Sequence, residues 1–181
     1  MKKIFITLLL IMTYCLPTYA SEQDIVNSFT NFTNNIVAEI QDSYNKNPYK
    51  VRFHEPLDIQ RKYYNDNGYW YKISKCNLKS SIDIQRTESL MTPYIGYLTL
   101  SSDAIFYYSS DNPKGEYRTK EEAEKASLQR LSVSETEYRF SYAYQNGQWV
   151  LKLAEWKHPD WTNGLWKEGT FSTPQSNFVI K

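Results

Sequence analysis

The chain has 181 residues, with 21 lysines and arginines against 20 aspartates and glutamates and hence a formal net charge of +1. This balance argues against a general nucleic-acid-binding protein, because phosphate binding rests on clustered basic side chains. It gives no support to binding at an anionic membrane surface either. Aromatic residues make up 16% of the chain, while glycine and proline are sparse. That composition favours a β-sheet protein, since aromatic side chains fit a pleated, half-buried surface.

Residues 1–20 have the three-part layout of a secretory signal peptide. Met1-Lys2-Lys3 is basic, an apolar run follows over 4–12, and Thr18-Tyr19-Ala20 ends the stretch with a small-x-small pattern. The apolar run is shorter than the roughly 20 residues of a membrane span. We therefore expect cleavage after Ala20, a periplasmic or secreted bacterial protein, and no stable membrane insertion after cleavage. Loss of the two lysines would leave 19 basic against 20 acidic residues.

The two cysteines are separated by this cleavage. Cys15 lies in the signal, and a lipoprotein acylated at Cys15 is disfavoured because bulky Tyr14 precedes it. Cys76 then stands alone, so no internal disulfide can form. A buried, inert Cys76 is favoured over a thiol made reactive by Lys75 and Lys79, and an intermolecular pairing would imply a homodimer.

The mature chain opens with a predicted amphipathic helix that ends in residues 45–48. Apolar side chains recur at spacings of three and four, which places them on one face. Ser21 followed by Asp24 resembles a capping arrangement at the start. The apolar positions are Ile25, Phe29, Phe32, Ile36, Val37, Ile40 and Tyr44.

After this helix, short apolar segments alternate with turn residues, which is typical of strands. We expect strands at 49–53, 57–64, 69–76, 80–87, 94–100 and 104–109, with a turn at 65–68 and a loop at 111–115. A second, charged surface helix is expected over 121–129, because Thr119 and Glu122 can form a capping box.

A hairpin near the end is the clearest local feature. Asn146-Gly147 is the preferred pair for a two-residue type I′ turn and separates strands predicted at 137–145 and 148–157. The turn predicts that Tyr142 faces Leu151 and that Phe140 faces Leu153. One side of the hairpin is then aromatic and aliphatic. Its members are Tyr138, Phe140, Tyr142, Tyr144, Trp149, Leu151 and Leu153. The first helix is the natural partner for this side.

A long helix packed across a curved antiparallel sheet is the architecture of cystatin-like and NTF2-like domains. In its order of elements, the chain resembles uncharacterised exported bacterial proteins of this α+β fold. The strands over 138–151 look like the final hairpin of such domains, and 86–96 looks like another of their segments. The resemblance spans 24–157. From the length of the chain after cleavage we expect a single domain over 21–157, and from its aromatic content we expect the tail 158–181 to pack on that domain. It implies no function, because the class contains enzymes, ligand binders and interaction modules.

No catalytic or metal signature stands out. The HExxH, CxxC, GxSxG and glycine-rich phosphate motifs are absent from the sequence. His54, Glu55 and Asp58 could form an acid/base cluster, but an exposed loop beside Pro56 is the favoured interpretation. We expect no metal ion and no cofactor.

The leading hypothesis is a non-enzymatic exported binding protein for a protein partner or a small apolar ligand in the concavity of the sheet. Arg86 and Tyr94 are the candidate binding residues there. An NTF2-like enzyme is the first alternative, and it requires His54, Asp58 or Arg86 to converge with Tyr94.

The second alternative is a glycan-binding module. Trp156, Trp161 and Trp166 recur every five residues, and exposed rings can stack on sugars or anchor a partner protein. The favoured interpretation is that the tail folds back and that these rings seal the second face of the sheet.

Overall fold

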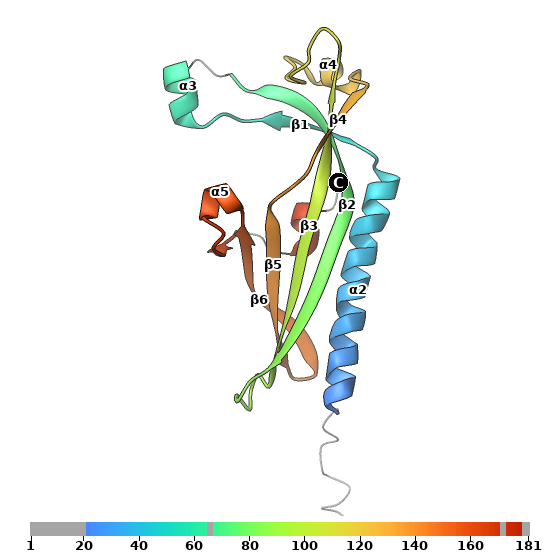
Figure 1. The fold of residues 1–181 in the computed structure, drawn as a ribbon, viewed down its shortest axis with the longest axis vertical. Coiled ribbons are helices and arrows are strands. Elements are labelled where there is room, and N and C mark those ends of the chain that lie inside the picture. Colours follow the sequence, from blue (N-terminus) through green and yellow to red (C-terminus); the bar gives the residue numbers. More distant parts are fainter. Residues whose placement is uncertain (1–20, 65–66, 171–172, 179–181) are drawn as a thin grey trace, which may run out of the picture.

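A long helix followed by an open, antiparallel seven-stranded sheet gives the protein an α+β fold (Figure 1). The computed structural model describes residues 21–64, 67–170 and 173–178. The predicted signal peptide and its cleavage site at Ala20 lie outside this part. Within it, no helix is long and apolar enough to cross a membrane.

The elements in chain order are α2 (Glu22–Lys46), β1 (Lys50–His54), α3 (Asp58–Tyr64), β2 (Tyr69–Arg86), β3 (Tyr94–Tyr108), α4 (Lys120–Glu124), β4 (Leu128–Ser132), β5 (Glu137–Gln145), β6 (Gln148–Lys157), α5 (Pro159–Thr162), β7 (Lys167–Glu168) and α6 (Pro174–Phe178).

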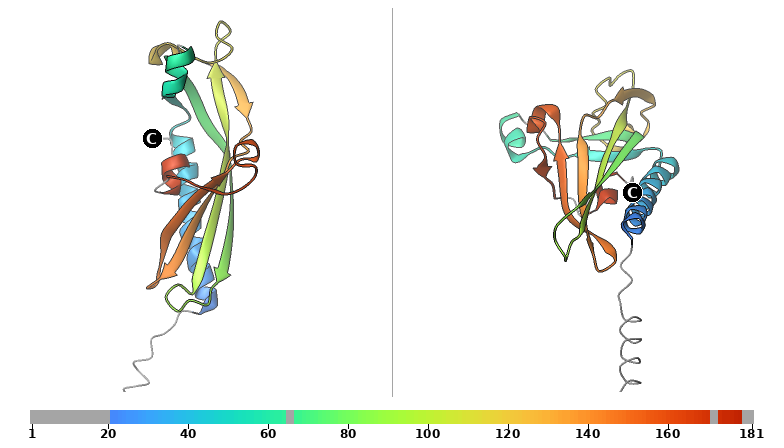
Figure 2. Two further views of the ribbon diagram at one scale, coloured as in Figure 1. Left: turned by 90° about the vertical axis from the view of Figure 1, so that its left-hand side faces the viewer. Right: turned by 60° about the horizontal axis from the view of Figure 1, so that its bottom comes forward.

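Helix α2 confirms the predicted amphipathic helix and its capping. The Ser21 hydroxyl accepts a hydrogen bond from the Asp24 backbone N–H at 3.1 Å, and the Asp24 carboxylate accepts one from the Ser21 N–H. These bonds satisfy N–H groups that the first turn leaves without helical partners. The helix lies along the long strands β2 and β3 (Figure 2), and its apolar side chains share a buried core with Leu98, Leu100 and Phe140. Phe29 at its centre is fully buried against Gly96 of β3.

The strands β2 and β3 are longer than predicted, since each joins two predicted segments into one. A β-bulge between Cys76 and Lys79 lets β2 continue, and Asn77 there has φ +50°. The Asp103 carboxylate holds the bulge by accepting a hydrogen bond from the Asn77 amide at 3.0 Å. A bulge shifts the inward–outward alternation of side chains by one residue. The sequence pattern of β2 is therefore interrupted at the bulge, and this interruption was interpreted as a gap between two strands.

One predicted element was wrong in type and another in length. Residues 58–64 form α3 instead of a strand, and a Glu55–Arg61 ion pair of 2.7 Å fastens this helix to the preceding loop. The predicted helix over 121–129 is confirmed as α4 with its capping box of Thr119 and Glu122, but it ends at Glu124. Residues Leu128–Ser132 form β4, in which Leu131 pairs with Ile105 of β3. Backbone pairing with the open edge of β3 outweighs the helical preference of this charged segment.

The hairpin of β5 and β6 has the predicted turn, with φ of +51° at Asn146 and +79° at Gly147. The predicted register is confirmed as far as Tyr142 opposite Leu151. Beyond it a bulge shifts the pairing, so Phe140 faces Ala154 instead of Leu153. Ala154 therefore joins the core at 5% exposure, while Leu153 turns outward at 37%.

The sheet has two parts because β3 changes neighbours along its length. Its first half pairs with β5 and its second half with β4, while β2 runs beside both. The residues of β3 that face α2 include Gly96 and Leu98, and strand alternation continues this face through Ala104 and Phe106. In the first half, the buried core under α2 fills this face. In the second half, the same face of the sheet carries the candidate site.

Candidate ligand-binding hollow

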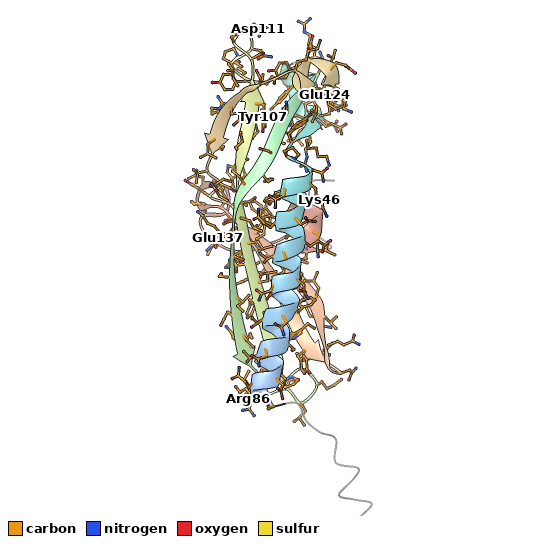
Figure 3. The ribbon with its side chains drawn as sticks, turned by 90° about the vertical axis from the view of Figure 1, so that its right-hand side faces the viewer. Lys46, Arg86, Tyr107, Asp111, Glu124 and Glu137 are labelled. Carbon is orange, nitrogen blue, oxygen red and sulfur yellow. The ribbon has the colours of Figure 1, made fainter. Side chains whose placement is uncertain are left out.

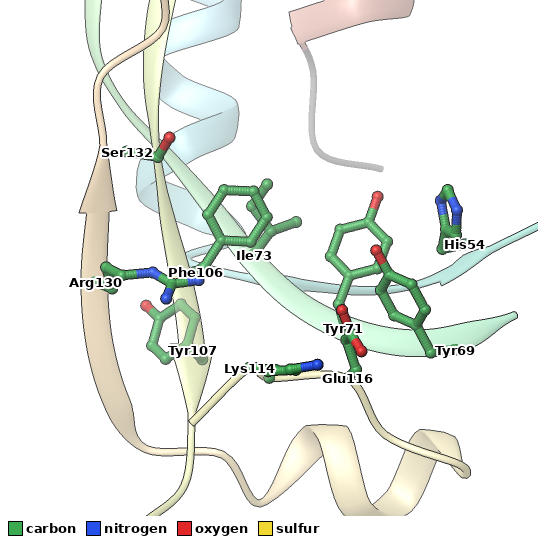
Figure 4. A pocket seen from close by; sticks show the side chains of 11 residues that line it. His54, Tyr69, Tyr71, Ile73, Phe106, Tyr107, Lys114, Glu116, Arg130 and Ser132 are labelled. Carbon is green, nitrogen blue, oxygen red and sulfur yellow. The ribbon is translucent and has the colours of Figure 1, made fainter. Parts of the chain in front are cut away.

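A hollow of about 410 Å³ opens on the second half of the sheet (Figure 4). Its walls come from β1, β2, β3, β4 and the loop after β3. The lining residues are His54, Tyr69, Tyr71, Ile73, Phe106, Tyr107, Lys114, Gly115, Glu116, Arg130 and Ser132. We refer to Tyr69, Tyr71, Ile73 and Phe106 as the aromatic wall.

Strand register brings the aromatic wall together. Ile73 is paired with Phe106, and Tyr71 and Tyr69 precede Ile73 at every second position of β2, so all four project from one face. The ring centroids of Tyr71 and Phe106 lie 6.3 Å apart, and those of Tyr69 and Tyr71 lie 6.1 Å apart. At its outer end, His54 stacks on Tyr69 with 4.7 Å between centroids. The wall is half-buried and leaves ring surface available to a ligand.

The opposite face of these strands is closed by packing. Tyr117, Ala123 and Ala126 form a second buried cluster there, against Trp70 and Tyr107. The buried Lys72 ties it together by donating hydrogen bonds to the carbonyl oxygens of Ala126 at 2.8 Å and Glu124 at 3.1 Å. Burial lowers the pKa of Lys72. Support from this cluster holds the aromatic wall in place from behind.

A second hollow, of about 590 Å³, fits a ligand less well. It lies beside α4 and the loop before it, and most of its lining side chains are charged or polar. Its apolar members, Tyr117 and Ala126, are already buried in the packed cluster behind the aromatic wall. Ligand sites need an apolar surface with a few well-placed polar groups. The hollow of about 410 Å³ at the aromatic wall offers that combination.

Arg86 and Tyr94 do not reach the hollow. They pair with each other at the far end of the sheet, where Tyr94 is buried and Arg86 lies 4.0 Å from Glu22 (Figure 3). At about 3.3 Å per residue, Arg86 lies roughly 55 Å along β2 from Tyr69. His54 and Asp58 belong to the hollow's end of the molecule. His54 and Asp58 therefore do not converge with Tyr94, and Arg86 is paired with Tyr94 outside the hollow.

The three tail tryptophans do not form one exposed strip. Trp156 pairs with Tyr138, whereas Trp166 lies 4.3 Å from the Arg139 guanidinium. Because Tyr138 and Arg139 are adjacent in a strand, these two rings lie on opposite faces of the sheet. Trp161 is 74% exposed and stacks on His158 with 4.3 Å between centroids. Trp161 is thus the exposed ring, whereas Trp156 and Trp166 are partly buried on different faces.

Glu135, His158 and Asp160 place one ligand atom each within 4.8 Å of one another, which is close enough to surround a metal ion. Nδ1 of His158, however, accepts a hydrogen bond from the Asp160 backbone N–H at 3.2 Å. A neutral imidazole that accepts at one nitrogen carries its proton on the other, so Nε2 is a donor and not a ligand. The geometry favours His158 as the N-cap of α5 over a role in metal binding.

Sequence reasoning missed the aromatic wall and Arg130. The spacing of Tyr69, Tyr71 and Ile73 indicated that they share a face, but nothing in the sequence indicated that this face stays open. Arg130 was missed because no strand was predicted there: the first two residues of β4, Leu128 and Gln129, were assigned to the end of a helix. No protein-family model, curated protein or solved structure matches the chain.

Proposed function

We propose that this protein is an exported, non-enzymatic binding protein that holds a small apolar ligand in the hollow. The observation that carries the proposal is the aromatic wall, which is half-buried on its open side and supported by a packed cluster behind. The volume of about 410 Å³ falls within the range of ligand sites, roughly 300 to 1,000 Å³.

The arrangement of the elements supports this proposal. A long helix lies along a bent antiparallel sheet, and we propose that the fold is of the cystatin-like or NTF2-like kind. The helix fills only one half of its sheet face, which leaves the other half for a ligand. Export is proposed from the signal-like residues 1–20 alone. The rival enzyme and glycan-binding hypotheses find no support in the placement of their residues.

The experiment uses N-phenyl-1-naphthylamine, a neutral aromatic probe that fluoresces in apolar surroundings. Protein recovered from the periplasm of an expressing bacterium is titrated with the probe. The probe itself is excited, and its fluorescence is measured at each concentration. We expect saturable binding of one probe per chain. Ser132→Trp should abolish it, because Ser132 lines the hollow and an indole would fill the space.

Gln129→Trp is the matched control. Gln129 belongs to the same strand and pairs with Tyr107, while Ser132 pairs with Ala104, so the two side chains leave opposite faces. Equal binding by the two variants would refute the hollow as the site. Failure of the unmodified protein to bind the probe would refute the proposal itself.

A further inference from the structure

Three basic side chains border the aromatic wall on its own face. Lys50 pairs with Ile73 and Arg52 pairs with Tyr71, and Lys75 follows Ile73 two positions along β2. Directly paired residues of antiparallel strands have their Cβ atoms about 5 Å apart on the same side. Lys50, Arg52 and Lys75, here called the basic cluster, therefore stand together at one margin of the hollow.

The basic cluster has no anionic partner among the residues that the structure describes. The ion pairs of the described residues join other side chains, such as Arg139 with Glu155 at 2.8 Å. None of these pairs includes Lys50, Arg52 or Lys75. Burial is the main reason why the pKa values of Lys50 and Lys75 are lowered. The positive charge of Arg52 is the second reason. Three like charges side by side, two of them on partly buried lysines and the third on the exposed Arg52, are unfavourable unless an anion joins them.

The remaining charges of the hollow add to the same sign. Lys114 and Arg130 line it, against Glu116 as the one carboxylate among its lining residues (Figure 4). The chain as a whole is almost neutral, at +1. Cations therefore outnumber carboxylates among the residues that line and border the hollow, and a recess with apolar walls strengthens their effect on an approaching anion.

We propose that the ligand of the hollow is a small amphiphilic anion, with an apolar body against the aromatic wall and a carboxylate, sulfonate or phosphate bound by the basic cluster. This inference rests on the proposed ligand-binding function and names the class of its ligand. The planar guanidinium of Arg52 can bind two oxygens of such a group at once, while the lysines act as point charges. An anionic group there would relieve the repulsion within the cluster.

The test compares two probes that share a ring system. 8-Anilinonaphthalene-1-sulfonate differs from N-phenyl-1-naphthylamine by a sulfonate group and has the same fluorescent rings. We expect the sulfonate probe to bind at least about tenfold more tightly than the neutral one. Arg52→Gln and Lys75→Met should each remove most of that preference, while affinity for the neutral probe stays within about twofold. Sodium chloride should weaken the binding of the sulfonate probe alone.

Lys120→Met is the matched control, because Lys120 lies on α4 and is paired with Glu124 at 3.7 Å. It removes one positive charge without touching the basic cluster and should leave both affinities unchanged. Equal affinity for the two probes, or an unaltered preference in Arg52→Gln and Lys75→Met, overturns the anionic-ligand proposal and leaves the binding function intact. If neither probe binds, the proposed function itself fails. Unfolding curves of each variant verify that it is folded.

Discussion

The contact between Phe29 and Gly96 predicts that adding one methyl group to the sheet destabilises the whole fold. A Cβ at position 96 would lie 2.5 Å from Cζ of Phe29 and 2.6 Å from its Cε2. Carbon atoms pack best at about 3.5 to 4.0 Å, so the ring would have to move away by about 1 Å. Trp149, 4.5 Å away between centroids, and Tyr142, 6.0 Å away, limit such a movement. We therefore expect Gly96→Ala to cost about 1 to 3 kcal/mol.

Urea unfolding measures this cost, and a double-mutant cycle assigns it to the ring. The smaller side chain in Phe29→Leu leaves room for the new methyl group, so Gly96→Ala should cost less in that background than in the unmodified protein. A coupling of about 0.5 to 3 kcal/mol is typical of residues in contact. Alanine otherwise suits a strand better than glycine does, by about 0.5 to 1 kcal/mol. Unchanged or increased stability of Gly96→Ala, or additive effects of the two substitutions, would refute the close-packing argument.

Two further predictions concern ionisable groups. Lys75→Met should raise the free energy of unfolding at pH 7 by up to about 1 kcal/mol, because it removes a cation that faces like charge. Burial lowers the pKa of Lys75 in the folded protein, so the gain should shrink as the pH rises toward the ordinary lysine value of 10.5 and vanish above it, where Lys75 is neutral in both states; an unchanged urea midpoint at pH 7 would contradict this. Burial raises the pKa of Tyr142 above its ordinary 10.0, so the folded protein keeps a proton that the unfolded chain loses. Stability should therefore fall above pH 10, and Tyr142→Phe should reduce that fall by up to about 1.4 kcal/mol per pH unit. Identical alkaline unfolding curves would count against burial of the hydroxyl.

Local patterns predicted the elements whose neighbours in sequence decide their structure. Helix α2 follows from the spacing of its apolar residues, and the turn of the last hairpin follows from Asn146-Gly147. The errors occur where distant pairing decides. The segment from Leu128 is a strand because β3 has an open edge there, and Leu153 faces outward because a bulge displaces it. Neither cause can be read from the residues themselves, since bulges and edge pairing depend on the opposing strand.

The same limit explains why the candidate site escaped prediction. Helix α2 ends at Lys46, before it can cover the second half of its sheet face, so the aromatic wall remains uncovered. The bulge at Asn77 then shifts the alternation of β2, which brings Lys75 onto the face that carries Ile84 in the first half. One face of one sheet thus contains a closed apolar core and, beyond the bulge, an open aromatic hollow bordered by unneutralised cations. A cluster that lowers stability is expected to persist where ligand binding offsets it, and this makes the basic cluster the first target for mutation.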